Sequence, residues 1–157
     1  MERHEEVLVA LRRIIRAVDL HSKRLMQRTG LSGPQLVIMQ VIGRGGPLSA
    51  GELARRASLS QATVTAILDR LEDRGLVLRE RSKEDRRRTL VALTDAGQAA
   101  LVGSPTLLQE HFLERFGAMP DWEQHLIIAS LQRVAQMMDA QHLDASPYLD
   151  PGELAGS

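Results

Sequence analysis

The sequence predicts a mainly α-helical fold that carries one small antiparallel β-hairpin. Three observations support this class: apolar residues recur at three- and four-residue intervals along most of the chain, helix-start signals precede several of these runs, and only two short stretches have the character of strands. With 157 residues, 43% of them hydrophobic, the chain has the size and composition of a single globular domain.

The first third of the chain predicts two helices of different character. From Glu5 to Thr29 the apolar residues repeat at helical spacing, and Gly30 is the residue type that most often ends a helix. A capping box with proline at the first helical position follows, Ser32-Gly33-Pro34-Gln35. Because residues 36–42 are apolar almost all round, we expect the second helix to be buried on more than one side.

The next stretch predicts two helices joined by a tight turn. The first begins at another capping box, Ser49-Ala50-Gly51-Glu52. It stops in Ser58-Leu59-Ser60, which is too short for anything but a turn between helices. Ser60 is expected to cap the second helix, Gln61 to Arg74, and Gly75 to end it. The apolar stripe of that helix is narrow and consists of Val64, Ile67, Leu68 and Leu71.

The outward face of this second helix carries short side chains, followed one turn later by a cation. They are Gln61, Ala62, Thr63, Thr65, Ala66 and then Arg70. Short polar or methyl-bearing side chains suit a helix that enters a DNA major groove, because bulk would hold its backbone away from the base edges. For this helix alone a solvated face is an equally good interpretation, since turn-linked helix pairs also occur in proteins that never touch DNA.

A basic hairpin follows the helix pair. Residues 77–81 and 89–93 predict two short strands, joined by Ser82-Lys83-Glu84-Asp85-Arg86-Arg87-Arg88. Three adjacent arginines repel one another, so a phosphate backbone or a minor groove is their natural counterpart. A merely solvated loop is the alternative interpretation.

Four linked motifs carry a resemblance to a known family. They are Ser60-Gln61-Ala62-Thr63-Val64-Thr65, Leu71-Glu72-Asp73-Arg74-Gly75-Leu76-Val77, Asp85-Arg86-Arg87 and Val91-Ala92-Leu93-Thr94-Asp95-Ala96-Gly97. At these separations they resemble the MarR family of bacterial winged-helix regulators over nearly the whole chain. The resemblance implies that residues 60–66 open the recognition helix, that Asp85 fixes the wing, and that Arg87 enters a groove. Because Ala66 stands where many relatives have a long basic residue, base readout would depend more on Gln61, Thr63 and Thr65.

The expected DNA-binding residues follow from the helix face, the hairpin and the resemblance together. They are Ser60, Gln61, Ala62, Thr63, Thr65, Ala66, Arg70, Lys83, Asp85, Arg86 and Arg87. The resemblance implies a homodimer that represses transcription from a palindromic operator of double-stranded DNA and responds to a small-molecule effector. It divides the chain into a winged helix-turn-helix core at 34–97, dimerisation helices at 1–30 and 98–142, and an irregular tail at 143–157. The alternative is a winged-helix protein-interaction module whose arginines meet an acidic protein.

The C-terminal half predicts three further helical segments. Thr94 is expected to cap a helix that breaks at Gly103-Ser104-Pro105, where Ser104 and Pro105 would start a new segment that runs to Gly117. Asp121 is expected to cap the last helix, with Gln124 at its third position. The apolar face of that helix is wider than one stripe, so part of it is expected to meet another subunit.

Charge and composition exclude several classes of protein. The formal net charge of zero divides into +3 for residues 1–43, +4 for 44–88 and −7 for 89–157, so the cations gather around the proposed reading head. The absence of cysteine excludes a disulfide or a thiol switch. The five histidines lack ligand spacing and no nucleophile or phosphate-loop motif occurs, so we expect no metal, no cofactor and no enzymatic activity. No apolar run is long enough for a membrane span, and the protein is expected in the cytoplasm.

His21 is the one candidate effector residue. It lies beside the apolar stripe of the first helix, near where relatives form an effector cleft, although a partly buried histidine with an ordinary hydrogen bond is the simpler interpretation. The segment around His21 and the region of Trp122 also resemble the branch of the family associated with compatible-solute genes. Compatible solutes and phenolic acids are therefore both candidate effectors.

Overall fold

The structure is a computed structural model that describes residues 2–143 and 148–149. The chain divides into two compact units. The first holds five helices, the β-hairpin and the pair Tyr148 and Leu149, and the second holds α6 and α7. Most of the tail that was expected to be irregular lies outside the described residues.

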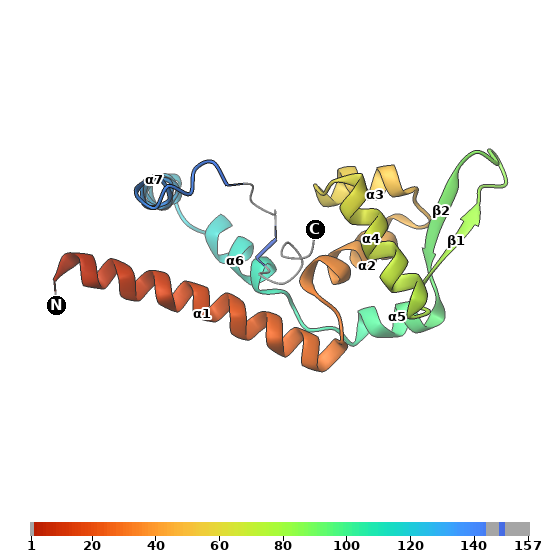
Figure 1. Ribbon diagram of the computed structural model, residues 1–157, viewed down its shortest axis with the longest axis horizontal. Coiled ribbons are helices and arrows are strands. Elements are labelled where there is room, and N and C mark those ends of the chain that lie inside the picture. Colours follow the sequence, from red (N-terminus) through yellow and green to blue (C-terminus); the bar gives the residue numbers. More distant parts are fainter. Residues whose placement is uncertain (1, 144–147, 150–157) are drawn as a thin grey trace. The chain divides into compact units, whose positions relative to one another are not determined.

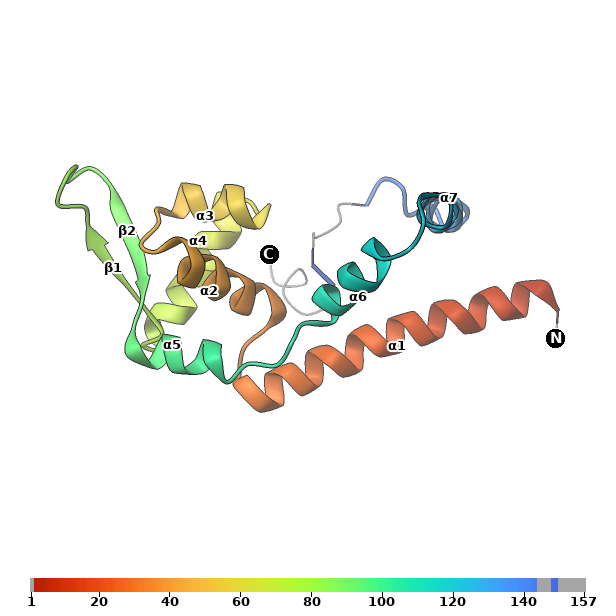
Figure 2. The ribbon, with the colours of Figure 1, turned by 180° about the vertical axis from the view of Figure 1, so that it is seen from behind.

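Helix α1, Arg3–Thr29, is long and largely exposed. It begins two residues before the predicted start and ends as predicted at Gly30, which adopts a left-handed φ of 66°. Figures 1 and 2 show it in red and orange, extending away from the other helices of its unit. Its apolar residues Val7 and Leu8 are 45% and 46% exposed, so this face of the helix is uncovered within one chain.

Helix α2, Gly33–Gly45, lies at the centre of the first unit. Its capping box is formed as predicted: Ser32 Oγ accepts from the Gln35 N–H at 3.3 Å, and Gln35 Oε1 accepts from the Ser32 N–H at 3.0 Å. The helix packs against α3, α4, α5 and β2. That packing buries Leu36, Ile38, Met39 and Ile42 on several sides, which explains the apolar pattern.

Helices α3, Ala50–Ala57, and α4, Gln61–Asp73, form the predicted helix-turn-helix. Ser49 and Glu52 make the reciprocal cap of α3. The turn uses a left-handed Ser58, with a φ of 54°. Gly75 follows α4 with a φ of 71°, the conformation that favours glycine there. The buried stripe of α4 is the predicted one, Val64, Ile67, Leu68 and Leu71.

The hairpin consists of β1, Val77–Arg81, and β2, Thr89–Leu93, with the predicted bounds. The strands are antiparallel, with Val77 opposite Leu93 and Arg81 opposite Thr89. Leu48, just before α3, extends the ladder by exchanging backbone hydrogen bonds of 3.1 and 2.8 Å with Val91. The base of the hairpin is therefore anchored to the helix-turn-helix.

Helix α5, Asp95–Val102, is capped by Thr94 as predicted, but the start predicted for the next helix is wrong. Helix α6, Leu108–Gly117, begins beyond Ser104 and Pro105. The Ser104 hydroxyl instead donates to the Leu101 carbonyl at 2.7 Å, so it satisfies the end of α5 rather than the start of α6.

Helix α7, Asp121–Met137, also begins differently from the prediction. Pro120 occupies the cap position, and Asp121 is the first helical residue. The Gln124 amide does not cap the helix but donates to the carbonyls of Phe116 and Met119 at 3.1 and 3.0 Å, which ties the end of α6 to the start of α7. Neither α6 nor α7 buries a side chain in the described part of the chain.

Arg74 joins the end of α4 to the end of α1. Its guanidinium donates to the Gly30 carbonyl through Nη1 and to the Thr29 carbonyl through Nη2, the latter at 3.3 Å. These carbonyls are among those that the C-terminus of a helix leaves unpaired. A guanidinium there supplies hydrogen bonds to them and also interacts favourably with the negative end of the helix dipole. None of the described helices has both the length and the apolar character that a membrane crossing requires.

Candidate nucleic-acid interface

The first turn of α4 is capped by Ser60. Its Oγ accepts from the Thr63 N–H at 3.1 Å and also donates to Thr63 Oγ1 at 2.8 Å. Because Thr63 accepts this second bond, its own hydroxyl hydrogen is left to donate outward. Ser60 is exposed and Thr63 is half-buried.

The remaining residues of the predicted reading face are exposed. They are Gln61, Ala62, Thr65, Ala66 and Arg70. The Thr65 hydroxyl donates to the Gln61 carbonyl at 2.9 Å, so its hydrogen is used within the helix while its oxygen can still accept. Among the described residues, the Gln61 amide and the Arg70 guanidinium have no hydrogen-bonding partner. The face therefore offers uncommitted polar groups on a narrow helix surface, as groove entry requires.

Two carboxylates on the same helix pair with Arg79 of β1, which offsets one of their two negative charges. Arg79 Nη2 lies 2.8 Å from Asp69 Oδ1, and Nη1 lies 3.4 Å from Glu72 Oε1. Free carboxylates on a helix that approaches DNA would repel the phosphates, and this pairing reduces that repulsion. The same contact fixes the base of the hairpin against α4. No local pattern in the sequence connects Arg79 with residues on another element, so this contact could not be predicted.

The tip of the hairpin is shaped by Asp85. Its Oδ1 accepts from the Arg87 N–H at 3.0 Å, and its carbonyl accepts from the Arg88 N–H at 3.0 Å. Ser82 closes the turn, its N–H donating to the Arg88 carbonyl at 2.8 Å. An aspartate side chain bonded two residues ahead is a common way to stabilise a tight turn.

The three arginines of the hairpin have two different environments. Arg88 forms an ion pair with Glu52 of α3, with Nη2 2.7 Å from Oε1. Arg86 and Arg87 are exposed, as is Lys83, and none of these three side chains has a partner within residues 2–143 and 148–149. Glu52 therefore compensates the charge of one of the three adjacent arginines, and the other two remain available to a ligand.

Glu52 connects the hairpin to the start of α3. A hydrogen bond from the Ser49 backbone N–H and then one from Arg88 lower the pKa of the Glu52 carboxyl below its ordinary value, so it is ionised at neutral pH. One carboxylate oxygen completes the cap of α3 and the other holds the wing.

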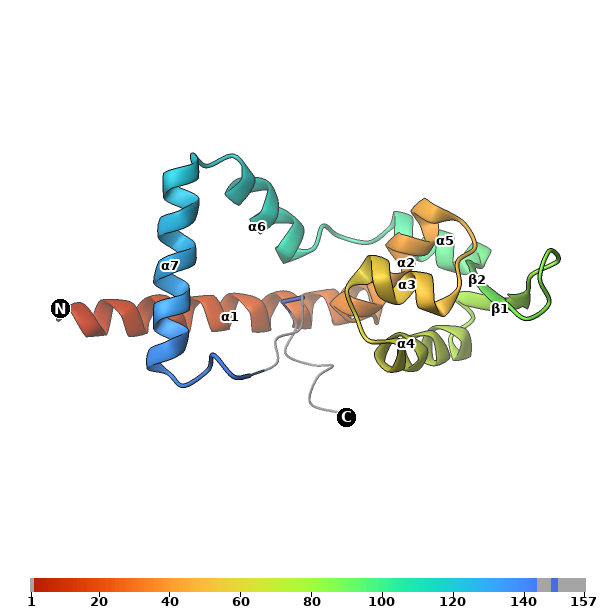
Figure 3. The ribbon, with the colours of Figure 1, turned by 90° about the horizontal axis from the view of Figure 1, so that it is seen from above.

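The two elements of the interface point the same way. The start of α4 and the tip of the hairpin both lie on the upper side of the first unit in Figure 1, and Figure 3 shows α4 running alongside α3 toward the hairpin.

His21, the candidate effector residue, is half-buried on α1. No three histidine, aspartate or glutamate side chains within the described ranges come together as a metal site.

A helix-turn-helix with an exposed second helix, next to a cationic β-wing on the same side, defines a winged helix-turn-helix DNA-binding protein. Comparison with known proteins agrees with this class. Residues 31–89 match the model of the MarR family. The chain is 30% identical over 115 residues to the HTH-type transcriptional regulator YcgE of Bacillus subtilis, which covers 73% of this chain and 75% of the relative. It therefore belongs to the MarR family, whose matched members are transcriptional regulators rather than enzymes.

Two further proteins are similar to this chain over most of its length. The homoprotocatechuate degradative operon repressor of Escherichia coli is 28% identical over 69% of this chain and 74% of its own length. Among solved structures, a MepR-like protein complexed with pseudoligands superposes with a TM-score of 0.60 at 25% identity, over 88% of this chain and 97% of that one.

Proposed function

We propose that the chain acts as a homodimeric repressor that reads a palindromic operator and is modulated by a small molecule. Two recognition helices, one from each subunit, enter successive major grooves about one helical turn apart, and the wings hold the flanking minor grooves. The observation that carries this proposal is the exposed start of α4 beside two wing arginines, Arg86 and Arg87, whose side chains have no partner in the described part of the chain.

Each group of exposed residues has a distinct part in this proposal. Gln61, Thr63 and Thr65 contact base edges, because their polar groups keep hydrogen-bonding capacity beyond the bonds made within the helix. The small residues allow the helix backbone to approach, and the cations bind phosphates or a minor groove. The small residues are Ser60, Ala62 and Ala66, and the cations are Arg70, Lys83, Arg86 and Arg87.

Exposed apolar side chains support the homodimer, with dimerisation regions at 1–30 and 98–142. The second unit buries no side chain within α6 or α7, yet Trp122 is 69% exposed and Leu126 is 58% exposed. In the first unit, the aliphatic face of α1 is exposed as well. Monomers rarely expose several large apolar side chains along whole helices in this way, and a two-fold partner covers such faces most simply.

Two similar proteins support repression as the direction of regulation and a small molecule as the modulator of DNA binding. One relative is an operon repressor, and one similar structure is complexed with pseudoligands. A regulator of this kind works where the chromosome is, which for a bacterial protein is the cytoplasm.

Selection of bound sequences from a random duplex library tests the proposal. We expect a palindromic motif whose half-sites are about 10 base pairs apart. Gln61→Ala and Thr63→Ala should each relax the preference at particular positions, by about 1–3 kcal/mol per contact. Gln98→Ala is the control, because Gln98 is exposed on α5, outside the interface. Failure to enrich any motif would contradict the proposal and favour an acidic protein as the partner of the wing.

A further inference from the structure

The Thr65 hydroxyl can accept a hydrogen bond from a ligand, but its own hydrogen is already used. That hydrogen is donated to the Gln61 carbonyl at 2.9 Å, one turn earlier on α4. The direction of this bond is fixed, because a carbonyl oxygen can only accept. Thr65 is exposed, and its oxygen has no further partner in the described part of the chain. A ligand that donates to this oxygen leaves the bond to Gln61 intact, whereas a ligand that accepts would have to break it.

The neighbours of Thr65 leave its oxygen accessible and supply no competing donor. Ala62 and Ala66 are both exposed and end at Cβ, so they do not cover it. Residues 61–68 contain neither lysine nor arginine, and the first cation of this face is Arg70. The donor that pairs with Thr65 must therefore come from outside the helix.

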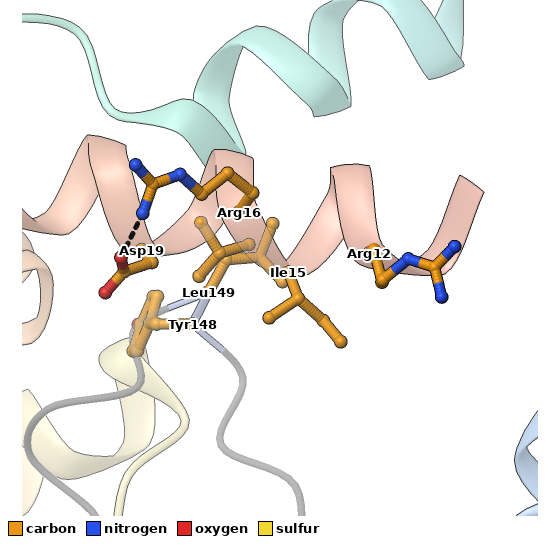
Figure 4. Close-up of a pocket in the computed structure, with 7 residues that line it drawn as sticks. Arg12, Ile15, Arg16, Asp19, Tyr148 and Leu149 are labelled. Carbon is orange, nitrogen blue, oxygen red and sulfur yellow. Dashed lines mark ion pairs between the residues drawn. The ribbon is translucent and has the colours of Figure 1, made fainter. Parts of the chain in front are cut away.

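The turn before α4 is restrained on both sides, which gives Thr65 a defined place. Ser60 caps the first turn of α4. At the other side of the turn, the Tyr148 hydroxyl donates to the carbonyl of Ala57, the last residue of α3. Tyr148 in turn lines the same pocket as Ile15 and Asp19 of α1 (Figure 4). The start of α4 is thereby tied to α1, and Thr65 meets the same base position each time the helix enters a groove.

The major groove offers few donors to such an oxygen. They are the exocyclic amino groups of adenine and cytosine, N6 and N4, whereas guanine and thymine present only acceptors there. We propose that Thr65 selects a base with an exocyclic amino group, adenine or cytosine, at one position of each operator half-site. Guanine or thymine at that position would place an acceptor opposite the Thr65 oxygen. This inference rests on the proposed function and adds the class of base that one residue reads.

Base analogues that lack only the amino group test the inference. In a duplex that the full-length protein selects, each adenine is replaced in turn by purine and each cytosine by pyrimidin-2-one, at the same position of both half-sites. At the position that Thr65 reads, the replacement should weaken binding by the wild type about fivefold or more, because the oxygen loses its donor. A response to purine identifies adenine as the base, and a response to pyrimidin-2-one identifies cytosine.

Variants of Thr65 assign the response to this residue. Thr65→Val replaces the hydroxyl by a methyl group of similar size, so loss of the amino group should then change the affinity less than about twofold. Thr65→Ala, a better helix former, should behave in the same way. Thr65→Ser keeps the hydroxyl and should keep the wild-type response. Thr106→Val, the same chemical change at an exposed position between α5 and α6, is the matched control and should also keep it.

Three results would overturn the inference. They are a half-site in which no amino group matters, a response that Thr65→Val and Thr65→Ala both retain, and a selected motif with guanine or thymine where Thr65→Val relaxes the preference. A chain that selects a motif but gives one of these results refutes the role of Thr65 alone. A chain that selects no motif refutes the proposed function and this inference with it.

Discussion

Arg88 at the end of the wing and Glu52 in the first turn of α3 form an ion pair across 36 positions of sequence, with 2.7 Å between Nη2 and Oε1. The same carboxylate accepts the Ser49 N–H through its other oxygen, at 3.0 Å. One side chain thus joins the cap of the helix-turn-helix to the hairpin that accompanies it. The position of the wing relative to the reading head depends on this contact and on the Arg79 pairs.

Loss of the Arg88 contact should loosen the wing without unfolding the protein. Since the pair is partly exposed, Arg88→Ala should lower the free energy of unfolding by less than about 1 kcal/mol. Amide hydrogen exchange in residues 82–89 should nevertheless become faster. Arg81→Ala removes a nearby exposed arginine that has no partner in the described ranges, and it should leave that exchange unchanged. Equal exchange in both variants would show that the pair does not hold the wing.

The pH dependence of this contact has a definite sign. The Glu52 pKa is lowered in the folded protein, first by the Ser49 hydrogen bond and then by Arg88, from an ordinary value of 4.5. The stabilisation is therefore present above pH 4.5 and is lost as the pH falls through the folded-state value. Glu52→Gln keeps an acceptor for the cap but removes the charge. Urea unfolding should show that the wild type is more stable than Glu52→Gln at neutral pH, and this difference in the free energy of unfolding should disappear in acid. A difference that does not change with pH would show that the Glu52 charge does not stabilise the fold.

Gly97 should tolerate no side chain. A Cβ at this position would lie 2.1 Å from the Leu76 carbonyl oxygen, so either α5 or the segment before β1 would have to move. Gly97→Ala should lower the free energy of unfolding by about 1–3 kcal/mol or more. Gly51→Ala is the matched control, because nothing lies within 4 Å of its added Cβ and alanine favours helix, which should raise stability by up to about 1 kcal/mol. Chemical denaturation of both variants measures whether the free energy of unfolding falls in Gly97→Ala and rises in Gly51→Ala.

Arg74 should control the fraying of α1 at its junction with the reading head. Arg74→Ala removes the donors to the Thr29 and Gly30 carbonyls, so amide exchange at the end of α1 should become faster. Arg28→Ala, an exposed arginine of the same last turn, should have a smaller effect. If both variants exchange alike, the guanidinium does not cap the helix.

The sequence predicted those features of the fold that are decided locally. The caps at Ser32, Ser49, Ser60 and Thr94 depend on residues three positions apart, and the structure contains all four. The start of α6 was predicted wrongly, because the Ser104 hydroxyl has two possible backbone partners and the sequence does not rank them.

Contacts between distant elements could not be predicted in the same way. The partners of Arg79 and Arg88 depend on how the hairpin packs against α3 and α4, and no spacing in the sequence encodes that packing. The exposure of the predicted reading face was foreseeable, since it follows from the apolar stripe on the opposite side of α4. The contact between Tyr148 and Ala57 joins residues 91 positions apart and has no local signal at all.

The salt dependence of duplex binding tests the central claim most directly. If α4 and the wing bind DNA, several phosphate contacts should make the affinity fall about a thousandfold or more between about 50 and 200 mM salt. Arg87→Ala should reduce the slope of log affinity against log salt by about one, while Arg115→Ala in α6 leaves it unchanged. Affinity that does not vary with salt, or a slope that Arg87→Ala leaves intact, would contradict the assignment of this surface to DNA.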